Sequence, residues 1–228
     1  MSEDEYYVSS IPADARVEEL TGKRTGRSGR EVRRYFVNNI YVGFREYSLS
    51  GQIEHECAMA QGEKHGWEYE WYGNGRLTSA IPYCHGRVHG TARVWGESGL
   101  LLGSYTMEHG TGLDLWWVEN EGMAQLSEAM VVNDNLMDGY DYRFAWYAPG
   151  QLKWEKWWSK GELHGIEREW DLNGELRSGY PTYWIHDKQV DRQEYDRTCR
   201  SDATLKPYSV EDNLPKRTFP PEVAQHLP

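Results

Sequence analysis

Residues Gly62-Glu-Lys-His-Gly66-Trp-Glu-Tyr-Glu-Trp71-Tyr-Gly-Asn-Gly75-Arg-Leu77 contain a turn, a short alternating segment that ends in tryptophan, a second turn and a leucine. The same order of features returns, with losses, every 22 to 27 residues between about residue 35 and about residue 191. A fixed period of this size is typical of a stack of supersecondary units. We therefore interpret the chain as a repeat protein.

Glycine, asparagine and aspartate mark equivalent places in the units. The residue that closes the first turn is Gly43, Gly66, Gly90, Gly112, Gly139, Gly165 or, in the last unit, Asp191. Four residues before it stand Asn39, Gly62, Gly86, Asn135, Gly161 and Asp187. The second turn contains Gly51, Gly75, Gly99, Gly122, Gly150 and Gly174. Because these three residue types best tolerate positive φ, the columns predict turns with a demanding backbone geometry.

Between the turns, apolar and polar side chains alternate. Trp67, Tyr69 and Trp71 are expected to point to one face, and Glu68 and Glu70 to a solvated face. Each unit is then a two-stranded hairpin. The predicted fold class is all-β, an elongated single-layer antiparallel β-meander of about six hairpin repeats with short irregular or helical ends.

Three parts are expected along the chain: an extension at 1–33, the repeat sheet at 34–194 and a proline-containing tail at 195–228. In the extension, the segment Ser10-Ile-Pro-Ala-Asp14 predicts a short helix that runs through Leu20. The basic, glycine-rich strip 22–34 predicts a solvated loop. The tail is expected to form an irregular cap or an extended peptide, with one or two helical turns at 220–227 as an alternative.

Composition and charge limit the classes of partner. Aromatic residues make up 14% of the chain, which indicates a thin core built from rings. The net charge of −11 disfavours nucleic acid and anionic membranes, since both need a basic footprint. It fits a protein partner with a basic surface. The alternative is that the acidity only keeps an aromatic sheet in solution.

The cellular compartment follows from what the sequence lacks. Cys57, Cys84 and Cys199 contain no CxxC pair, which suits free thiols in a reducing compartment. The first residues have no basic region followed by an apolar run, so no signal peptide is expected. No apolar stretch is long enough to span a bilayer. We expect a cytoplasmic protein without a membrane partner.

Histidine recurs at the turns. His65, His89 and His164 each precede a closing glycine. Equivalent residues of neighbouring units are expected about 10 Å apart, too far to share one ion, so we interpret them as turn residues that donate locally. His85 and His89 flank one turn beside Cys84, but Cys84 and His85 are expected to point to opposite faces. No metal and no cofactor are predicted.

The sequence offers little for catalysis. It contains no GxSxG motif, and its strand carboxylates are expected to face solvent on a sheet with few clefts. A non-enzymatic protein is therefore predicted, and no small-molecule ligand is expected.

Tryptophans are the candidates for partner contacts, because Trp is enriched at binding hot spots and exposed aromatic patches mark interaction sites. The candidates are Trp71, Trp95, Trp117, Trp146, Trp157, Trp158 and Trp170. The alternative is that each ring packs against its neighbours. Since Trp157 and Trp158 are adjacent, they must point to opposite faces, and one of them is either covered by a terminal segment or exposed.

Two stretches resemble MORN-type repeats, and more closely the bacterial variant in YwqK-type antitoxins. They are 71–77 with 83–90, and 146–152 with 158–165. The resemblance extends over about 35–191 and is weaker at the shortened turn near Gly110, in the long fourth unit and in the last unit, where aspartate replaces glycine. It implies an elongated, twisted single-layer sheet and a role in protein contacts.

Three functions remain open. The first is a protein-binding repeat scaffold, such as an antitoxin or immunity protein that neutralises a toxin. The second is an adaptor or regulatory target in a multiprotein defence or signalling system, whose C-terminal tail is recognised or cleaved. The third is a hydrolase with zinc at Cys84, His85 and His89.

Overall fold

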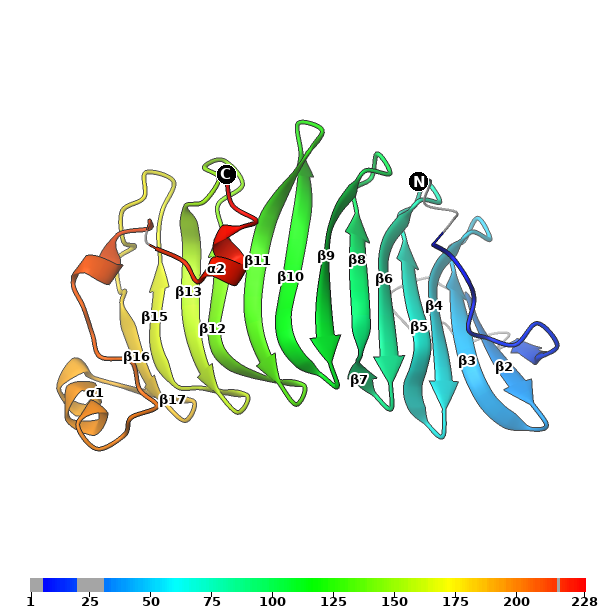
Figure 1. Cartoon of the computed structure of the whole chain (residues 1–228), viewed down its shortest axis with the longest axis horizontal. Coiled ribbons are helices and arrows are strands. Elements are labelled where there is room, and N and C mark those ends of the chain that lie inside the picture. The colour runs from blue at the N-terminus through cyan, green and yellow to red at the C-terminus, as the bar shows by residue number, and fades with distance from the viewer. Residues whose placement is uncertain (1–5, 20–30, 217) are drawn as a thin grey trace. The chain divides into compact units, whose positions relative to one another are not determined.

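The computed structural model describes residues 6–19, 31–216 and 218–228, and these form an all-β fold with a few short helices (Figure 1). The chain divides into two compact units. Unit 1 comprises Met1–Gly110 and Glu121–Ala124, and unit 2 comprises Thr111–Asn120 and Gln125–Pro228. In both units the strands follow one another as an antiparallel meander, so the predicted fold class is confirmed.

The strands of unit 1 pair with their sequence neighbours. They are β1 (Arg16–Glu19), β2 (Glu31–Val37), β3 (Ile40–Tyr47), β4 (Ile53–Ala60), β5 (Glu63–Trp71), β6 (Leu77–Cys84), β7 (Arg87–Val88), β8 (Gly90–Trp95) and β9 (Leu101–Glu108). Register pairs Glu56 with Tyr69 and Tyr69 with Ala80, so these three side chains share one face.

Unit 2 continues the same pattern and ends in short helices. Its strands are β10 (Thr111–Asn120), β11 (Met123–Asn133), β12 (Leu136–Phe144), β13 (Leu152–Ser159), β14 (Glu162–Leu163), β15 (Gly165–Glu169), β16 (Thr182–Ile185) and β17 (Lys188–Val190). The helical elements are α1 (Arg192–Cys199), the 3-10 turn η2 (Glu211–Asn213) and α2 (Pro221–Ala224). Among the described residues, no helix has both the length and the apolar character needed to cross a bilayer.

The turn columns have the predicted backbone geometry. All twelve glycines that close the first turn or lie in the second turn of a repeat have positive φ, and so do Asn39, Asn135 and Asp187. In the column four residues before the closing glycine, the preceding residue is also left-handed, as at His85 (φ 49°) before Gly86 (φ 73°). Two consecutive positive φ angles are typical of a two-residue hairpin turn.

The prediction that Asp191 closes a turn, as the glycines of the same column do, is wrong. Its φ is −77°, and its side chain accepts a hydrogen bond from the backbone N–H of Glu194 as the N-cap of α1. Aspartate suits both a left-handed turn and a helix cap, so residue type alone did not separate the two.

The helix predicted for the N-terminal extension is also wrong within the described residues. Residues 6–11 lie along the sheet, and Arg16–Glu19 form β1, which pairs with β2. Leu20 and positions 22–30 of the basic strip lie outside the described residues. The expected boundaries at 33/34 and 194/195 fall inside β2 and α1. In the tail, the helical alternative is realised at α2.

Candidate functional site

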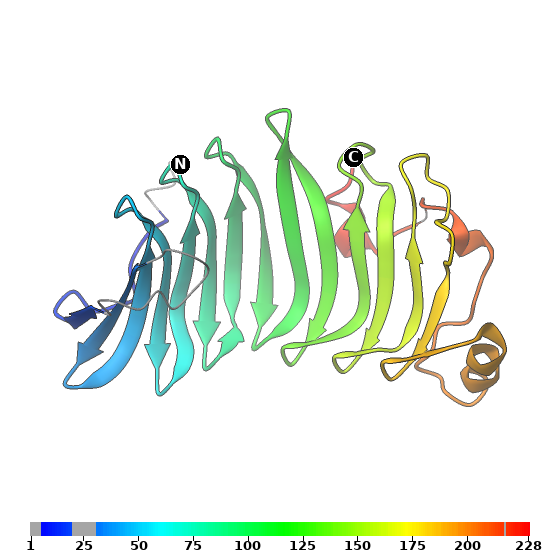
Figure 2. The same ribbon diagram turned by 180° about the vertical axis from the view of Figure 1, so that it is seen from behind.

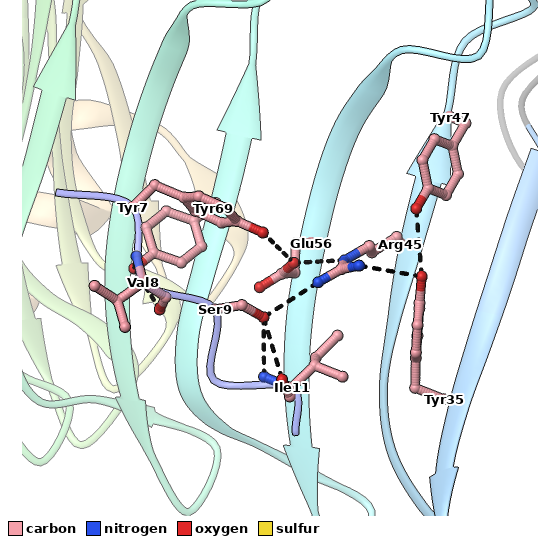
Figure 3. A network of polar contacts seen from close by, with 9 residues as sticks. All are labelled: Tyr7, Val8, Ser9, Ile11, Tyr35, Arg45, Tyr47, Glu56 and Tyr69. Carbon is pink, nitrogen blue, oxygen red and sulfur yellow. Dashed lines mark hydrogen bonds and ion pairs between the residues drawn. The ribbon is translucent and has the colours of Figure 1, made fainter. Parts of the chain in front are cut away.

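Residues 6–11, the N-terminal strap, lie across one face of the unit 1 sheet (Figures 1 and 3). The ring of Tyr6 lies 5.5 Å from that of Trp95, and the ring of Tyr7 lies 5.0 Å from that of Tyr69. Edge-on and tilted ring contacts at such distances are favourable. The strap therefore covers the aromatic face of this unit.

Tyr69 binds the strap backbone. Its hydroxyl accepts a hydrogen bond from the N–H of Val8 (3.2 Å) and lies within donating distance of the carbonyl oxygens of Val8 (3.1 Å) and Tyr6 (3.3 Å). The Tyr69 side chain is fully buried. The Tyr69 hydroxyl thus gives this part of the strap backbone a hydrogen-bond partner on the sheet.

Ser10 passes close to the sheet at a glycine. Its Oγ accepts from the N–H of Trp67 (3.1 Å). A Cβ at Gly66 would lie 2.7 Å from the Cβ of Ser10, and φ at Gly66 is +97°. Gly66 thus serves the turn geometry and also leaves room for the strap.

A charged network lies beneath the strap (Figure 3). Oε2 of the buried Glu56 accepts from Nε of Arg45 (2.6 Å) and from the hydroxyl of Tyr7 (2.8 Å). Arg45 also donates to Ser9 Oγ (3.3 Å) and to the hydroxyl of Tyr35 (3.4 Å). Burial, with the negative charge of Glu56, raises the pKa of Tyr7 to about 12. A buried carboxylate requires partners of this kind, so the network anchors the strap.

The tail of unit 2 uses a similar anchor. Arg168, fully buried, donates through Nη1 to Oε1 of the buried Glu155 (2.6 Å). Its Nε donates to Oδ1 of Asn213 (3.1 Å), and its Nη2 donates to the carbonyl oxygen of Ser209 (3.4 Å). One guanidinium therefore joins two strands of the sheet to the tail.

Aromatic contacts complete the cover of unit 2. Nε1 of Trp170 donates to the carbonyl oxygen of Asn213 (2.6 Å). The ring of Phe219 lies 5.5 Å from that of Tyr142 and 5.3 Å from that of Phe144. Figure 1 shows the tail in front of β12, β13 and β15, and Figure 2 shows it behind them. The tail covers one face of this sheet.

Trp157 and Trp158 lie on opposite faces, as predicted. Trp157 pairs in register with Tyr140 on the covered face, and Nζ of Lys206 from the tail lies 5.0 Å from its ring centre. Trp158 points the other way, and its Nε1 donates to Oδ2 of Asp141 (3.2 Å). Trp157 is thus the member covered by a terminal segment.

We call the second face of β12, β13, β15 and β16 the open face. The half-buried rings of Trp154, Trp158 and Trp184 lie on it. Trp154 lies 5.3 Å from the guanidinium of Arg143 and 4.9 Å from Nζ of Lys156. In the described part of unit 2, Figure 2 shows no segment across these strands.

The seven tryptophan candidates are not equivalent. Trp95, Trp117 and Trp170 are buried, with exposed fractions of 2%, 7% and 2%. Trp71 is half-buried beside Tyr7 of the strap. Trp146, at the turn after β12, is 64% exposed. Trp146 and Trp158 thus retain ring surface away from the strap and the tail. The sequence did not single out Trp154 and Trp184, because period two does not show which face a terminal segment covers.

Asp141 is an unusual acid on the open face. It is 4% exposed, and its Oδ1 has no hydrogen-bond partner among the described residues. Burial raises its pKa from 3.8 to about 6, with Glu128 adding to the shift, while Trp158, Lys156 and Arg143 act against it. The folded state therefore holds this proton more tightly than the unfolded state.

Asp141→Asn is expected to stabilise the protein at pH 8 by about 1–3 kcal/mol, because it removes a buried charge. The advantage should shrink at pH 5, where the wild-type carboxyl is already protonated in the folded state. Urea denaturation of both proteins at pH 5 and pH 8 measures this, and comparison at each pH cancels the histidine contributions. An advantage of equal size at both pH values contradicts the assignment.

The expectation that Glu68 faces solvent is wrong. Glu68 is 7% exposed, and its carboxylate receives hydrogen bonds from Nε2 of His55 (2.9 Å) and Nζ of Lys64 (2.7 Å). Burial alone would raise its pKa, but these two partners outweigh it and hold the pKa at about 2. The alternation placed Glu68 on the correct side of the strand, opposite Tyr69. It did not reveal that this side is sheltered.

The turn histidines form pairs between neighbouring sequence repeats. The ring centres are 4.9, 4.1 and 4.2 Å apart in the pairs His65–His85, His89–His109 and His164–His186. In each pair, Nδ1 of the first residue accepts from the backbone N–H of the second, at 3.4, 3.2 and 3.2 Å. The prediction that these histidines donate hydrogen bonds within their own turn is therefore wrong, because their Nδ1 atoms accept hydrogen bonds from the next sequence repeat.

Two groups of described residues combine side chains that bind metal ions. They are His65, Cys84 and His85, and His164, His186 and Asp202, and in each group the ligand atoms lie within 4.8 Å of one another. The expectation that Cys84 and His85 diverge is wrong. With φ at 49°, His85 has left the extended conformation on which side-chain alternation depends.

A hollow of about 550 Å³ lies between β10, β11, β12 and α2, with Leu113, Asp138, Tyr140 and Glu222 in its lining. Burial, with Glu222, raises the pKa of Tyr140 to about 12. Asp138 accepts from the backbone N–H of Lys160 (3.2 Å) and from Nδ2 of Asn133 (3.3 Å). The polar groups here hold turns together rather than converge on one point.

Comparison with known proteins finds no family model and no curated protein that matches the chain. The resemblance to MORN-type repeats rests on the turn and tryptophan columns alone.

Proposed function

We propose that the chain is a MORN-like, non-enzymatic scaffold that binds a protein on the open face of unit 2, as an antitoxin or immunity protein would. The observation that supports this proposal most directly is that the tail occupies one face of this sheet (Figure 2), whereas Trp154, Trp158 and Trp184 lie on the other. Half-exposed tryptophans on a rigid sheet are typical of binding hot spots, because they bury a large area at a small cost in side-chain entropy.

The charge of the chain supports a basic partner. The net charge is −11, and the open face itself carries both signs, with Glu167 3.3 Å from Lys156 and Glu128 of β11 2.6 Å from Arg143. Long-range attraction from the whole chain steers a basic protein, and local pairs then fix its orientation. A toxin with a basic, nucleic-acid-binding surface has this chemistry.

The adaptor function is the second candidate, and it requires a tail that a partner can reach. The tail is bound through Arg168, Trp170 and Phe219, which favours a role as a cap. Early cleavage of the wild-type tail by added protease would favour the adaptor.

Trp154→Ala is expected to weaken partner binding by about tenfold or more without unfolding the sheet, because the ring is half-buried and held mainly by two cations. The measurement begins with purification of the tagged chain from native lysate and identification of the co-purified protein. Titration of that protein against wild type and variant then gives the two affinities, and thermal unfolding confirms that both are folded.

Leu49→Ala is the matched control, since Leu49 is 81% exposed in a turn of unit 1. Its affinity for the partner should equal that of wild type. The proposal fails if Trp154→Ala binds as tightly as wild type, or if the chain sediments with liposomes and recovers no protein.

A further inference from the structure

Three ligand-type side chains meet where β5 lies beside the turn between β6 and β7. His65 comes from β5, Cys84 ends β6, and His85 begins the turn. Their ligand atoms lie within 4.8 Å of one another, and the two imidazole rings are 4.9 Å apart. Both histidines are exposed, and the Cys84 thiol is free and half-buried. The group is therefore accessible from solvent.

We propose that His65, Cys84 and His85 bind one Zn²⁺ ion. Imidazole nitrogen and thiolate sulfur are the usual zinc ligands, at about 2.0–2.1 Å and 2.3 Å. In a tetrahedral site these bond lengths place the ligand atoms about 3.4–3.6 Å from one another. Rotation of exposed side chains closes the gap from 4.8 Å, so the backbone does not have to move.

The hydrogen bond at His65 does not prevent coordination. Its Nδ1 accepts from the N–H of His85 at 3.4 Å, the longest of the three equivalent bonds. Coordination through Nδ1 replaces this weak bond, and the released N–H lies in an exposed turn where water accepts it.

The sister pairs show which feature is specific to this group. In the pair His89–His109, Glu108 stands where Cys84 stands, and this trio is not within ligand distance. Histidine pairing is therefore a structural feature that both pairs share. The thiol of Cys84 is what distinguishes the group at His65 from the pair His89–His109.

The third pair already uses its nitrogens. His164 is 2% exposed, its Nδ1 accepts from the N–H of His186, and its Nε2 lies 3.0 Å from Oγ1 of Thr204 and 3.4 Å from Asp202. That group is satisfied by protein contacts. Of the two groups found among the described residues, the one at His65 has ligand atoms free to bind an ion.

Three protein ligands leave a fourth position of the ion open to solvent. Because the ion would join β5 to the β6–β7 turn, it stabilises the folded state of unit 1 by binding there and not to the unfolded chain. This inference is independent of the proposed scaffold function, whose binding face lies in unit 2.

The experiment titrates the full chain with Zn²⁺ by calorimetry and with Co²⁺ by absorption. We expect one Zn²⁺ per chain and a thiolate-to-cobalt charge-transfer band. Cys84→Ser should remove the band and lower the Zn²⁺ affinity by about tenfold or more. His85→Asn should lower it similarly, and Asn keeps the positive φ of the turn. Zn²⁺ should also protect Cys84, but not Cys199, from alkylation, as read by mass spectrometry.

His109→Asn is the matched control, because it alters the equivalent turn of the sister pair. It should bind Zn²⁺ as wild type does. The site is refuted if wild type and Cys84→Ser bind Zn²⁺ equally, if no thiolate band appears, or if His109→Asn loses as much affinity as His85→Asn.

Discussion

Arg168→Met is expected to lower the free energy of unfolding by about 3–5 kcal/mol, the usual cost of removing one member of a buried ion pair. Arg168 and Glu155 are both fully buried and 2.6 Å apart. The substitution removes the cation that faces this carboxylate. It also removes the donors to Asn213 and Ser209, so the tail should detach and become sensitive to protease. Urea denaturation and limited proteolysis measure the two effects.

Two further variants separate burial from charge. Arg177→Met breaks an ion pair with Glu169 at a site where the arginine side chain is 56% exposed, and it should cost about 1 kcal/mol or less. The double variant Glu155→Leu/Arg168→Met removes both charges and should recover much of the lost stability. If Arg168→Met costs no more than Arg177→Met, the buried pair does not anchor the tail.

Tyr69→Ala is expected to cost about 3–5 kcal/mol, as large-to-small aromatic substitutions in cores do. The Tyr69 ring lies between Trp67 and Trp71, 5.8 Å from each, and beneath Tyr7. Its removal leaves a cavity under the strap and takes away the partner of the Val8 peptide group. Cleavage beside Tyr7 should therefore accelerate along with the loss of stability.

Tyr69→Phe isolates the hydroxyl. It keeps the ring but removes the contacts to the strap backbone, and it should cost about 1–3 kcal/mol. Trp146→Ala, at a ring 64% exposed, should change stability by about 0.5 kcal/mol or less. A strap that stays protease-resistant in Tyr69→Ala would show that Glu56 and Arg45 hold it without Tyr69.

The hairpins and their turns were predictable because their causes are local. Positive φ restricts a position to glycine, asparagine or aspartate, and the spacing of these residues gave the strand lengths. The same reasoning gave a wrong prediction at Asp191, because aspartate there caps α1 instead of closing a turn. The pair Asp191 and Glu194, three residues apart, is a helix-start signal that the sequence contained and the repeat pattern obscured.

Segments that pack by long-range contact were predicted poorly. Ser10 and Pro12 fit a helix start, yet the chain around them lies on the sheet because Ile11 is buried against Tyr35 and Ala58. In the candidate zinc group, the sequence suggested Cys84 and His85 but joined them to His89 instead of His65, for a related reason. Cys84 and His85 converge only because the turn is left-handed at His85, and His65 joins them from a strand twenty residues earlier.

The sequence by itself determined the meander, its turns and the two faces of each strand, because φ preferences and period-two alternation act within a few residues. Only the tertiary structure decided which face is covered, which tryptophans remain exposed and which acids are buried. Those outcomes depend on partners far away in the chain. Tyr7 reaches Glu56 across 49 positions, and Arg168 reaches Asn213 across 45. No local pattern encodes such a meeting, since it is decided by which terminal segment fits an aromatic face best.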